Sequence, residues 1–437
     1  MRFYSTKGRE FNVSFEEAVF RGMPKDDGLY MPEEIPLFSN DFFSPLNNCS
    51  WHELCLEIAT AFLEDDIPCD ILKGIIEGAL NFESPLVKLQ DNLYILELFH
   101  GPTLSFKDFG ARFMARVLSH FVGKTDKRLY VLVATSGDTG SAVGSGFLHV
   151  QGIEVIILYP QNKVSWIQEK QLTTMGNNVT ALEIDGSFDD CQKLVKKAFL
   201  DQDLRDKLSI TSANSINVSR LIPQIFYYIY AAAQVEEPSL PLVFSVPSGN
   251  FGNLSAGLIA KRMGLPVHRY VASTNANDVL PIYLKTGVFE ARPSIKTISN
   301  AMDVGNPSNF SRILDLYDGK RDAMAEDIFA ESFSDDQTRG AIVEAQKKYG
   351  YLMDPHTAVG YLGLQEYLHT IDYPVNGVIL STAHPAKFLE EIKNLIEEDL
   401  VIPDSLQRSL DSKKQSIELS KDYEDFKTYL LSKDLKK

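Results

Sequence analysis

One lysine stands in a sequence setting that could make it a nucleophile. Lys107 follows a Gly-Pro turn, within the stretch 100–108, which reads HGPTLSFKD. An ordinary lysine has a pKa of about 10.4, so a lysine that forms an imine at neutral pH must be partly desolvated on a fixed backbone. The apolar side chains of Leu104 and Phe106 could provide that environment. The alternative is a solvated lysine at a helix start, paired with the nearby Asp108.

Two glycine-rich turns could bind anions. A strand expected over 129–134 breaks into the turn 135–140, and a strand over 242–246 breaks, after Pro247, into the turn 248–253. Each turn opens a helix, where unpaired backbone N–H groups and the helix dipole attract negative charge. Glycine lets the backbone approach an oxyanion closely. Neither turn matches a Walker loop or Gly-x-Gly-x-x-Gly, and the alternative is two ordinary tight turns.

A third candidate lies near the C-terminus. The short apolar run 377–380 predicts a buried strand that ends at Ser381 and Thr382. A hydroxyl at the carboxyl end of a strand is well placed to contact a ligand at a topological switch point. A plain helix cap is the alternative.

Taken together, these motifs resemble the threonine synthase family. That family uses pyridoxal phosphate (PLP) and shares its fold with the tryptophan synthase β-subunit. The N-terminal part of the likeness is the discriminating one, because cysteine synthases and threonine dehydratases lack it. The resemblance extends over almost the whole chain, through segments 4–8, 14–18, 28–32, 106–108, 135–140, 215–217, 249–253, 303–308, 354–358 and 381–385.

The resemblance implies roles for the cofactor-binding residues. Lys107 would carry PLP and then move protons as a general acid and base. Thr382 would face the pyridine nitrogen, and a neutral hydroxyl there favours elimination over transamination because it does not keep the ring nitrogen protonated. The cofactor phosphate would be held by the backbone of Gly249, Asn250, Phe251, Gly252 and Asn253.

The resemblance also implies a substrate site. The substrate carboxylate would be received by Ser136, Gly137, Asp138 and Thr139. Most relatives of the wider fold carry asparagine where this chain has Asp138, although long-form threonine synthases share the aspartate. This departure leaves the partner of the cofactor's 3′-oxygen open. Arg112, Asn217 and Arg220 are candidates for the substrate phosphate, with ordinary surface or capping roles as the alternative.

The function implied is that of a PLP-dependent carbon–oxygen lyase of threonine biosynthesis. It would convert O-phospho-L-homoserine and water to L-threonine and phosphate, by γ-elimination followed by addition of water at Cβ. Two other interpretations stay open. One is a lyase or dehydratase of the same fold that acts on serine, threonine or an O-acetylated amino acid, and the other is a non-catalytic threonine-synthase-like binding protein, against which the intact Lys107 argues.

The net charge and the lack of long apolar runs limit the binding partners and the cellular compartment that we expect for this protein. The net charge of −16 over 437 residues argues against a nucleic-acid surface. No run of 18 apolar residues occurs and the segment 1–5 lacks a signal-peptide core, so we expect a cytoplasmic protein without membrane contact. It should act as a monomer or a homodimer.

The cysteines point to a reducing compartment. The chain has four, with no C-x-x-C pair. Cys49, His52 and Cys55 form C-x-x-H-x-x-C, but one helical face cannot carry all three as ligands, and a fourth would have to come from elsewhere. We expect structural residues and predict no metal.

Alternating strand and helix patterns predict an α/β fold. We expect two doubly wound, mainly parallel sheet domains of the tryptophan synthase β-like fold, preceded by an N-terminal accessory segment (1–90). A larger PLP-binding domain would comprise 91–125 and 205–437, with a smaller domain (126–204) inserted in it. Helices are expected after Ser14, which forms a capping box with Glu17, and over 51–63, and the charged tail after Leu410 should be a solvated helix. Strands are expected over 93–98, 129–134, 155–158, 179–184, 242–246, 267–272 and 377–380.

Overall fold

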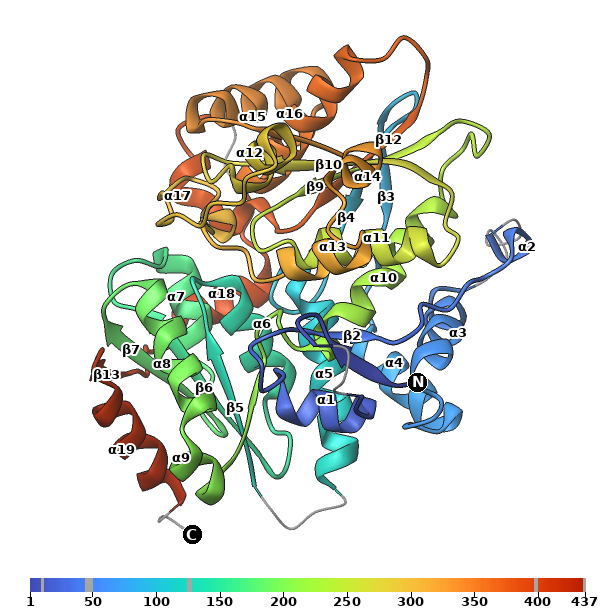
Figure 1. Cartoon of the computed structure of the whole chain (residues 1–437). Coiled ribbons are helices and arrows are strands. Elements are labelled where there is room, and N and C mark those ends of the chain that lie inside the picture. Colours follow the sequence, from blue (N-terminus) through green and yellow to red (C-terminus); the bar gives the residue numbers. More distant parts are fainter. Residues whose placement is uncertain (9–11, 44–49, 124–127, 397–399, 435–437) are drawn as a thin grey trace.

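Two mainly parallel β-sheets form the framework of the molecule (Figure 1). The computed structural model describes residues 1–8, 12–43, 50–123, 128–396 and 400–434. We call the larger sheet with its helices the larger unit, and the smaller sheet with its helices the smaller unit. The prediction of a mainly parallel α/β fold with an N-terminal segment is confirmed.

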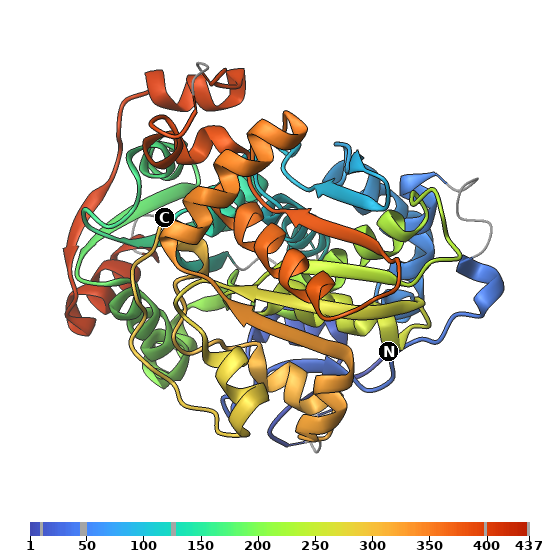
Figure 2. The ribbon, with the colours of Figure 1, turned by 90° about the horizontal axis from the view of Figure 1, so that it is seen from above.

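The larger unit is built on six strands in the order β11-β10-β9-β12-β4-β3. All neighbours are parallel except the edge strand β3, which is antiparallel to β4. Seen from above, α16 crosses one face of this sheet (Figure 2), while α10 and α11 pack together on the other side. The strands are β3 (Leu86–Gln90), β4 (Leu93–Glu97), β9 (Leu242–Pro247), β10 (Val267–Thr274), β11 (Ile328–Ser332) and β12 (Asn376–Ser381). The helices are α10 (Val218–Ala232), α11 (Gly252–Arg262), α12 (Val279–Thr286), η2 (Asn300–Met302), α13 (Phe310–Leu316), α14 (Arg321–Asp327), α15 (Asp335–Tyr349), α16 (Pro355–His369), η3 (Pro385–Phe388) and α17 (Leu389–Ile392).

The smaller unit contains five parallel strands in the order β13-β7-β6-β5-β8. The central strands β5 and β6 are almost entirely apolar and buried, which is typical of a parallel sheet covered on both faces. The strands are β5 (Leu129–Ala134), β6 (Ile153–Pro160), β7 (Val179–Asp185), β8 (Ser209–Ser212) and β13 (Ile417–Ser420). The helices are α6 (Asp138–Phe147), α7 (Trp166–Thr173), α8 (Phe188–Leu200), α9 (Gln202–Lys207), α18 (Asp404–Asp411) and α19 (Tyr423–Asp434).

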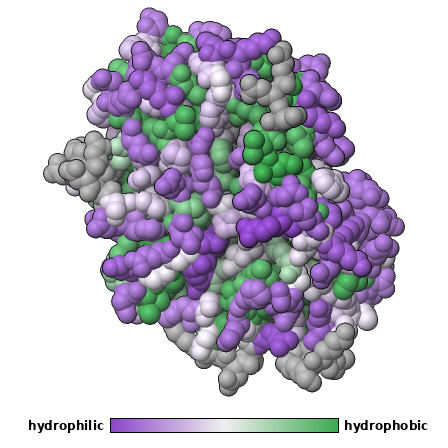
Figure 3. Space-filling model, turned by 180° about the vertical axis from the view of Figure 1, so that it is seen from behind, coloured by the Kyte–Doolittle hydropathy of each residue, from purple (hydrophilic) through white to green (hydrophobic). Residues whose placement is uncertain are grey.

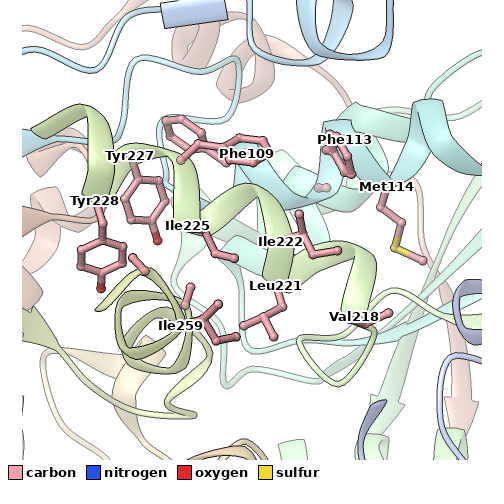
Figure 4. Packing of buried hydrophobic residues seen from close by; sticks show 14 of the residues in the cluster. Phe109, Phe113, Met114, Val218, Leu221, Ile222, Ile225, Tyr227, Tyr228 and Ile259 are labelled. Atoms are coloured by element: carbon pink, nitrogen blue, oxygen red, sulfur yellow. The ribbon is translucent and has the colours of Figure 1, made fainter. Parts of the chain in front are cut away.

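One helix connects the two units. Helix α5 (Lys107–Val122) packs against α6 of the smaller unit and against α10 of the larger one. Figure 4 shows Phe109, Phe113 and Met114 of α5 facing apolar side chains of α10, and the rings of Phe109 and Tyr227 meet edge to face with centroids 5.2 Å apart. Because these side chains are completely buried, α5 is held firmly at its first turn, where Lys107 lies.

The N-terminal segment packs beside α5 and α10. It contains β1 (Phe3–Ser5), α1 (Phe15–Arg21), β2 (Tyr30–Pro32), α2 (Asn40–Phe43), α3 (Trp51–Leu63) and α4 (Cys69–Ala79). Arg312 on α13 ties this segment to the rest, because its buried guanidinium donates to the carbonyl oxygens of Tyr30, Ser215 (2.9 Å) and Ile216 (2.8 Å). Burial lowers the pKa of Arg312 to about 9.

The expected helix starts are present. Ser14 caps α1 by accepting a hydrogen bond from the Glu17 N–H, and α3 spans the predicted residues 51–63, with a capping box at Ser50. All seven expected strands occur. The strands that the sequence did not indicate are three to five residues long, and two of them, β8 and β13, mix polar with apolar side chains.

The charged tail contains the predicted helix, α19 (Tyr423–Asp434), but the prediction that this helix is solvated was wrong. The segment after Leu410 adds β13 to the edge of the smaller sheet and packs α19 against α8, with Phe426 and Leu430 fully buried. These two residues are four apart, so a single turn of an otherwise charged helix presents both to the core. The pairings of β13 and β8 place both strands with the smaller sheet, whereas the sequence-based division assigned 205–437 to the larger domain.

The cysteine–histidine pattern lies only partly within the described residues. Cys49 lies outside them, Cys55 is buried in the core, and the His52 ring nitrogen contacts the Leu80 carbonyl oxygen at 3.0 Å. In the described ranges, no group of three His, Cys, Asp or Glu side chains is arranged to bind a metal.

The surface carries mixed polarity. On the face seen in Figure 3, hydrophilic side chains predominate and apolar ones form separate patches. Within the described parts of the chain, none of the helices has the length and apolar character that a bilayer crossing requires.

The packing of helix α19 can be tested by removing one of its buried side chains, which leaves a cavity. Phe426→Ala should lower the free energy of unfolding by about 3 kcal/mol, because it removes a fully buried ring. The control is Thr428→Ala, an exposed position on the same helix. Chemical denaturation measures both, and equal midpoints for the two variants would contradict the packing of α19.

Candidate active site

A cavity of about 770 Å³ opens where the carboxyl ends of strands from both sheets meet. Its wall includes residues that directly follow β5, β9 and β12. Parallel α/β sheets commonly bind ligands at this edge. The wall contains most of the residues singled out in the sequence, namely Lys107, Ser136, Asp138, Thr139, Arg220, Gly249, Asn250, Phe251, Gly252, Asn253 and Thr382.

Backbone hydrogen bonds fix the turn that presents Lys107. The N–H of Phe106 donates to the Thr382 carbonyl oxygen at 2.9 Å, and the N–H of His384 donates to the Leu104 carbonyl oxygen at 3.0 Å. The turn is thereby joined to the end of β12. Lys107, as the first residue of α5, is held next to Thr382 although 275 residues of sequence separate them.

Lys107 lies in a desolvated setting. Its Nζ atom is 4.2 Å from the centroid of the Phe106 ring, and its side chain lines the cavity. Burial, reinforced by the positive charge of Arg220 and opposed by Asp138, lowers the pKa of Lys107 to about 8. Asp108 instead accepts hydrogen bonds from the N–H and hydroxyl of Thr103, both at 2.8 Å. The alternative of a solvated lysine paired with Asp108 therefore does not describe this site.

Backbone strain is concentrated at two turns beside the cavity. In the described ranges, eight non-glycine residues have positive φ, and six of them are Asn, Asp or His, which tolerate that conformation. The other two are Leu104 and Phe251, both at φ 58°. One precedes Lys107 by three residues and the other is the N-cap of α11. Such strain persists only where the surrounding structure enforces it, and it is typical of functional turns.

The N-terminus of α11 provides hydrogen-bond donors at the cavity wall. Asn253 is held by two buried tyrosines, because the hydroxyls of Tyr227 (2.6 Å) and Tyr228 (2.7 Å) donate to its Oδ1 atom. Its Nδ2 group is buried and has no hydrogen-bond partner within the described part of the chain. The N–H groups of the first helical turn lack intrahelical acceptors. An anion bound there would satisfy these donors.

The glycines of this turn have different surroundings. A Cβ at Gly249 would lie 2.6 Å from the Cα of Met302, so close backbone packing excludes a side chain there. At Gly252 the nearest atom would be Ser215 Cβ at 3.4 Å, an ordinary contact. Packing within the protein therefore does not account for glycine at position 252, whereas the approach of a ligand does.

The turn 135–140 is shaped by its own side chains. The Thr135 hydroxyl accepts from the N–H groups of Gly137 and Gly140, both at 2.9 Å. Gly137 has φ 146°, and a Cβ there would meet Gln168 at 2.6 Å. Asp138 forms an ion pair with Lys387, with 2.7 Å between the carboxylate oxygen and Nζ. Burial acts to raise the pKa of Asp138, but the charge and hydrogen bond of Lys387 outweigh it and the pKa is lowered.

Of the three residues considered for binding the substrate phosphate, one lines the cavity and two do not. Arg112 donates to the carbonyl oxygens of Ala79 and Gly78 and to Asn81, and Asn217 caps α10. Neither lines the cavity, which argues against the predicted substrate role of these two residues. Arg220 lines the cavity and is buried, and burial lowers its pKa to about 10. Its Nε atom has no hydrogen-bond partner among the residues that the structure describes.

Two further polar groups of the wall were not assigned from the sequence. The Nε2 atom of His356 accepts from the Ala301 N–H at 3.1 Å, so the ring proton lies on Nδ1, which contacts Asp354 at 2.8 Å. Burial raises the pKa of Asp303 to about 6, against hydrogen bonds from Thr297. Both residues belong to motifs that carried the family resemblance, but their patterns alone specified no chemistry.

Comparisons with known proteins agree over the whole chain. Residues 80–381 match the family model described as pyridoxal-phosphate dependent enzyme, residues 2–80 match threonine synthase N terminus, and residues 357–430 match threonine synthase, C-terminal. The chain is 43% identical to a threonine synthase of Haemophilus influenzae, over 99% of this chain and 100% of that protein.

Solved structures show the same likeness. The crystal structure of threonine synthase from Escherichia coli superposes with a TM-score of 0.93 at 40% identity, covering 99% of this chain and 100% of that one. A PLP-bound threonine synthase from Brucella melitensis has a TM-score of 0.91 at 34% identity, with 98% of each chain covered.

The lowered pKa of Lys107 can be measured directly. Only the neutral amine reacts with an acylating reagent, so labelling of the cofactor-free protein at Lys107 should rise with pH to a midpoint near pH 8 and then level off. Arg220→Met should move this midpoint upward, and Asp138→Asn should move it downward. Mass spectrometry of the peptide that contains Lys107 reports the extent of labelling. A midpoint above pH 10, as for an exposed lysine, would contradict the desolvated setting.

Proposed function

Because the chain belongs to the threonine synthase family, we propose that it converts O-phospho-L-homoserine and water to L-threonine and phosphate, with PLP carried on Lys107. Family membership makes it a PLP-dependent lyase of threonine biosynthesis. The assignment of Lys107 depends on its position. This residue begins a helix whose start is fixed by backbone hydrogen bonds, and its side chain lies in a desolvated setting on the wall of the cavity.

The cavity fits the cofactor. The PLP phosphate would bind at the first turn of α11, where the Nδ2 of Asn253 and backbone N–H groups need acceptors and Gly252 leaves room. The hydroxyl of Thr382 would face the pyridine nitrogen of PLP. The residues proposed to hold PLP are Lys107, Gly249, Asn250, Phe251, Gly252, Asn253 and Thr382.

Lys107 and Thr382 would have different roles in the reaction. PLP, when bound, supplies an electron sink for the carbons next to the substrate amine. The amine of Lys107, with its pKa near 8, is suited to take a proton from Cα and to deliver or remove protons at neighbouring carbons near neutral pH. The neutral hydroxyl of Thr382 keeps the sink moderate, which favours loss of the γ-phosphate over transamination.

Charge recognition would occur at two places. We assign the substrate carboxylate to the turn that contains Ser136, Gly137, Asp138 and Thr139, at the N-terminus of α6. Arg220 would bind the substrate phosphate, because it brings a buried positive charge to the cavity wall and a guanidinium is a strong donor for a dianion.

The cysteines and the net charge bear on the compartment and the partners of the protein. Among the described residues, the thiols of Cys69 and Cys191 are free, which supports a reducing compartment such as the cytoplasm. The acidic net charge supports the absence of nucleic-acid partners. We retain a monomer or a homodimer as the proposed assembly. For the domains, we propose an N-terminal segment that ends before β3 rather than at residue 90, because β3 pairs with β4, a larger unit that begins at β3, and a smaller unit that also includes β8 and the C-terminal tail.

The anion turn can be tested by filling the space at Gly252. Gly252→Val should weaken PLP binding by about 100-fold, through loss of two or three hydrogen bonds to the phosphate, while the cofactor-free protein remains folded. Gly74→Val is the matched control, since a Cβ at this glycine of α4 has no heavy atom within 4 Å. Equilibrium dialysis measures PLP retention. Full retention in Gly252→Val would make the turn purely structural.

The substrate assignment can be tested by stoichiometry. O-Phospho-L-homoserine should release phosphate and threonine in equal amounts, and Lys107→Ala should reduce the rate by about 10³-fold or more. Homoserine should be rejected by about 10⁴-fold, because it leaves the buried phosphate donors unpaired. O-Acetylserine should likewise give no product. Release of α-ketobutyrate in place of threonine would instead indicate a lyase that does not deliver water to Cβ.

A further inference from the structure

A fully buried lysine of the larger unit reaches the carboxylate-binding turn of the smaller one. Lys387 belongs to η3 and its side chain is completely buried. Its Nζ atom lies 2.7 Å from the Asp138 carboxylate and donates to the Thr103 carbonyl oxygen at 2.8 Å. An ammonium group buried to this degree needs a counter-charge, and Asp138 provides it.

A second polar link runs beside this ion pair. The Gln168 side chain on α7 donates from Nε2 to Asp138 at 2.9 Å and accepts at Oε1 from the Asn300 amide at 3.1 Å. Asp138 and Gln168 belong to the smaller unit, whereas Lys387 and Asn300 belong to the larger one. Two neighbouring links therefore join the units across the cavity wall.

The position of Asp138 poses an electrostatic problem. The turn in which it lies is proposed to receive the substrate carboxylate, and a second carboxylate a few ångströms away would repel it strongly in a site with little water. Asp138 is buried, and its contacts with Lys387 keep it ionised. The repulsion is therefore removed only if Lys387 cancels the charge.

We propose that Lys387 is a positioning residue for the substrate: by pairing with Asp138 it neutralises the carboxylate-binding turn and fixes that turn against the larger unit. This inference rests on the proposed function, in which the turn binds the carboxylate. Lys387 itself does not take part in the bond-making steps. By cancelling the charge of Asp138, it determines whether the turn repels or accepts an anion.

A cycle of substitutions separates this role from plain stabilisation. Lys387→Met removes the charge at similar length and leaves Asp138 ionised and unpaired. Asp138→Asn with Lys387→Met restores a neutral turn, in which the asparagine oxygen can still accept from Gln168 and the Thr103 carbonyl still accepts from Gln171. Lys414→Met is the matched control, because Lys414 pairs with Glu169 of α7 and with Glu183, away from the turn.

We expect Lys387→Met to raise the KM for O-phospho-L-homoserine by at least about tenfold, with kcat changed far less. The affinity for L-threonine should fall in parallel, whereas inorganic phosphate, which has no carboxylate to place, should bind as before. The melting temperature of the cofactor-free protein should drop by about 5 °C. The double variant should recover most of both losses, and Lys414→Met should leave KM and threonine binding unchanged.

Two results would overturn the proposal. One is an unchanged KM and threonine affinity in Lys387→Met, even if the protein melts earlier, since this would make the pair merely structural. The other is a double variant that binds threonine as poorly as the single one. A wild-type protein that forms no threonine would refute the proposed function instead, and the threonine and phosphate binding measurements would still decide the role of Lys387.

Discussion

The hydrogen bonds between the turn 104–106 and the end of β12 are the constraint on which the site depends. They join two segments that are distant in sequence and determine where α5 begins. Because α5 packs between α6 and α10, the side chain of Lys107 starts from a fixed backbone position on the cavity wall, beside the Phe106 ring. Its low pKa is thus a consequence of backbone placement. Placing the turn in this way requires the strained left-handed backbone conformation of Leu104.

Sequence patterns predicted most of the framework and both glycine-rich turns of the cavity wall. Long apolar strands such as β5 and β9 were evident because parallel sheets bury both faces. Short strands such as β13 were missed because they obtain their order from a neighbouring strand and carry little pattern of their own. The tail was misjudged for a related reason, since the two buried residues of α19 are outnumbered by charges.

The side chains of the site were harder to predict than its backbone. Arg112 and Asn217 were selected for their closeness in sequence to motifs, but each is occupied by backbone groups outside the cavity. Arg220 differs from them only in its position on the inner face of α10, which periodicity does not specify. Lys387 lies two residues beyond the recognised segment 381–385 and its partner Asp138 is about 250 residues away, and no local pattern encodes a contact of that range.

The place of β13 has a consequence for the order of events during synthesis. This strand covers the outer edge of β7, which until then exposes a row of unpaired backbone groups. Its residues follow every described strand of the larger sheet along the chain, so during synthesis the smaller sheet remains open at one edge when the larger one already has its strands. Nascent chains interrupted before residue 417 would therefore carry an uncovered sheet edge, which is a template for intermolecular pairing.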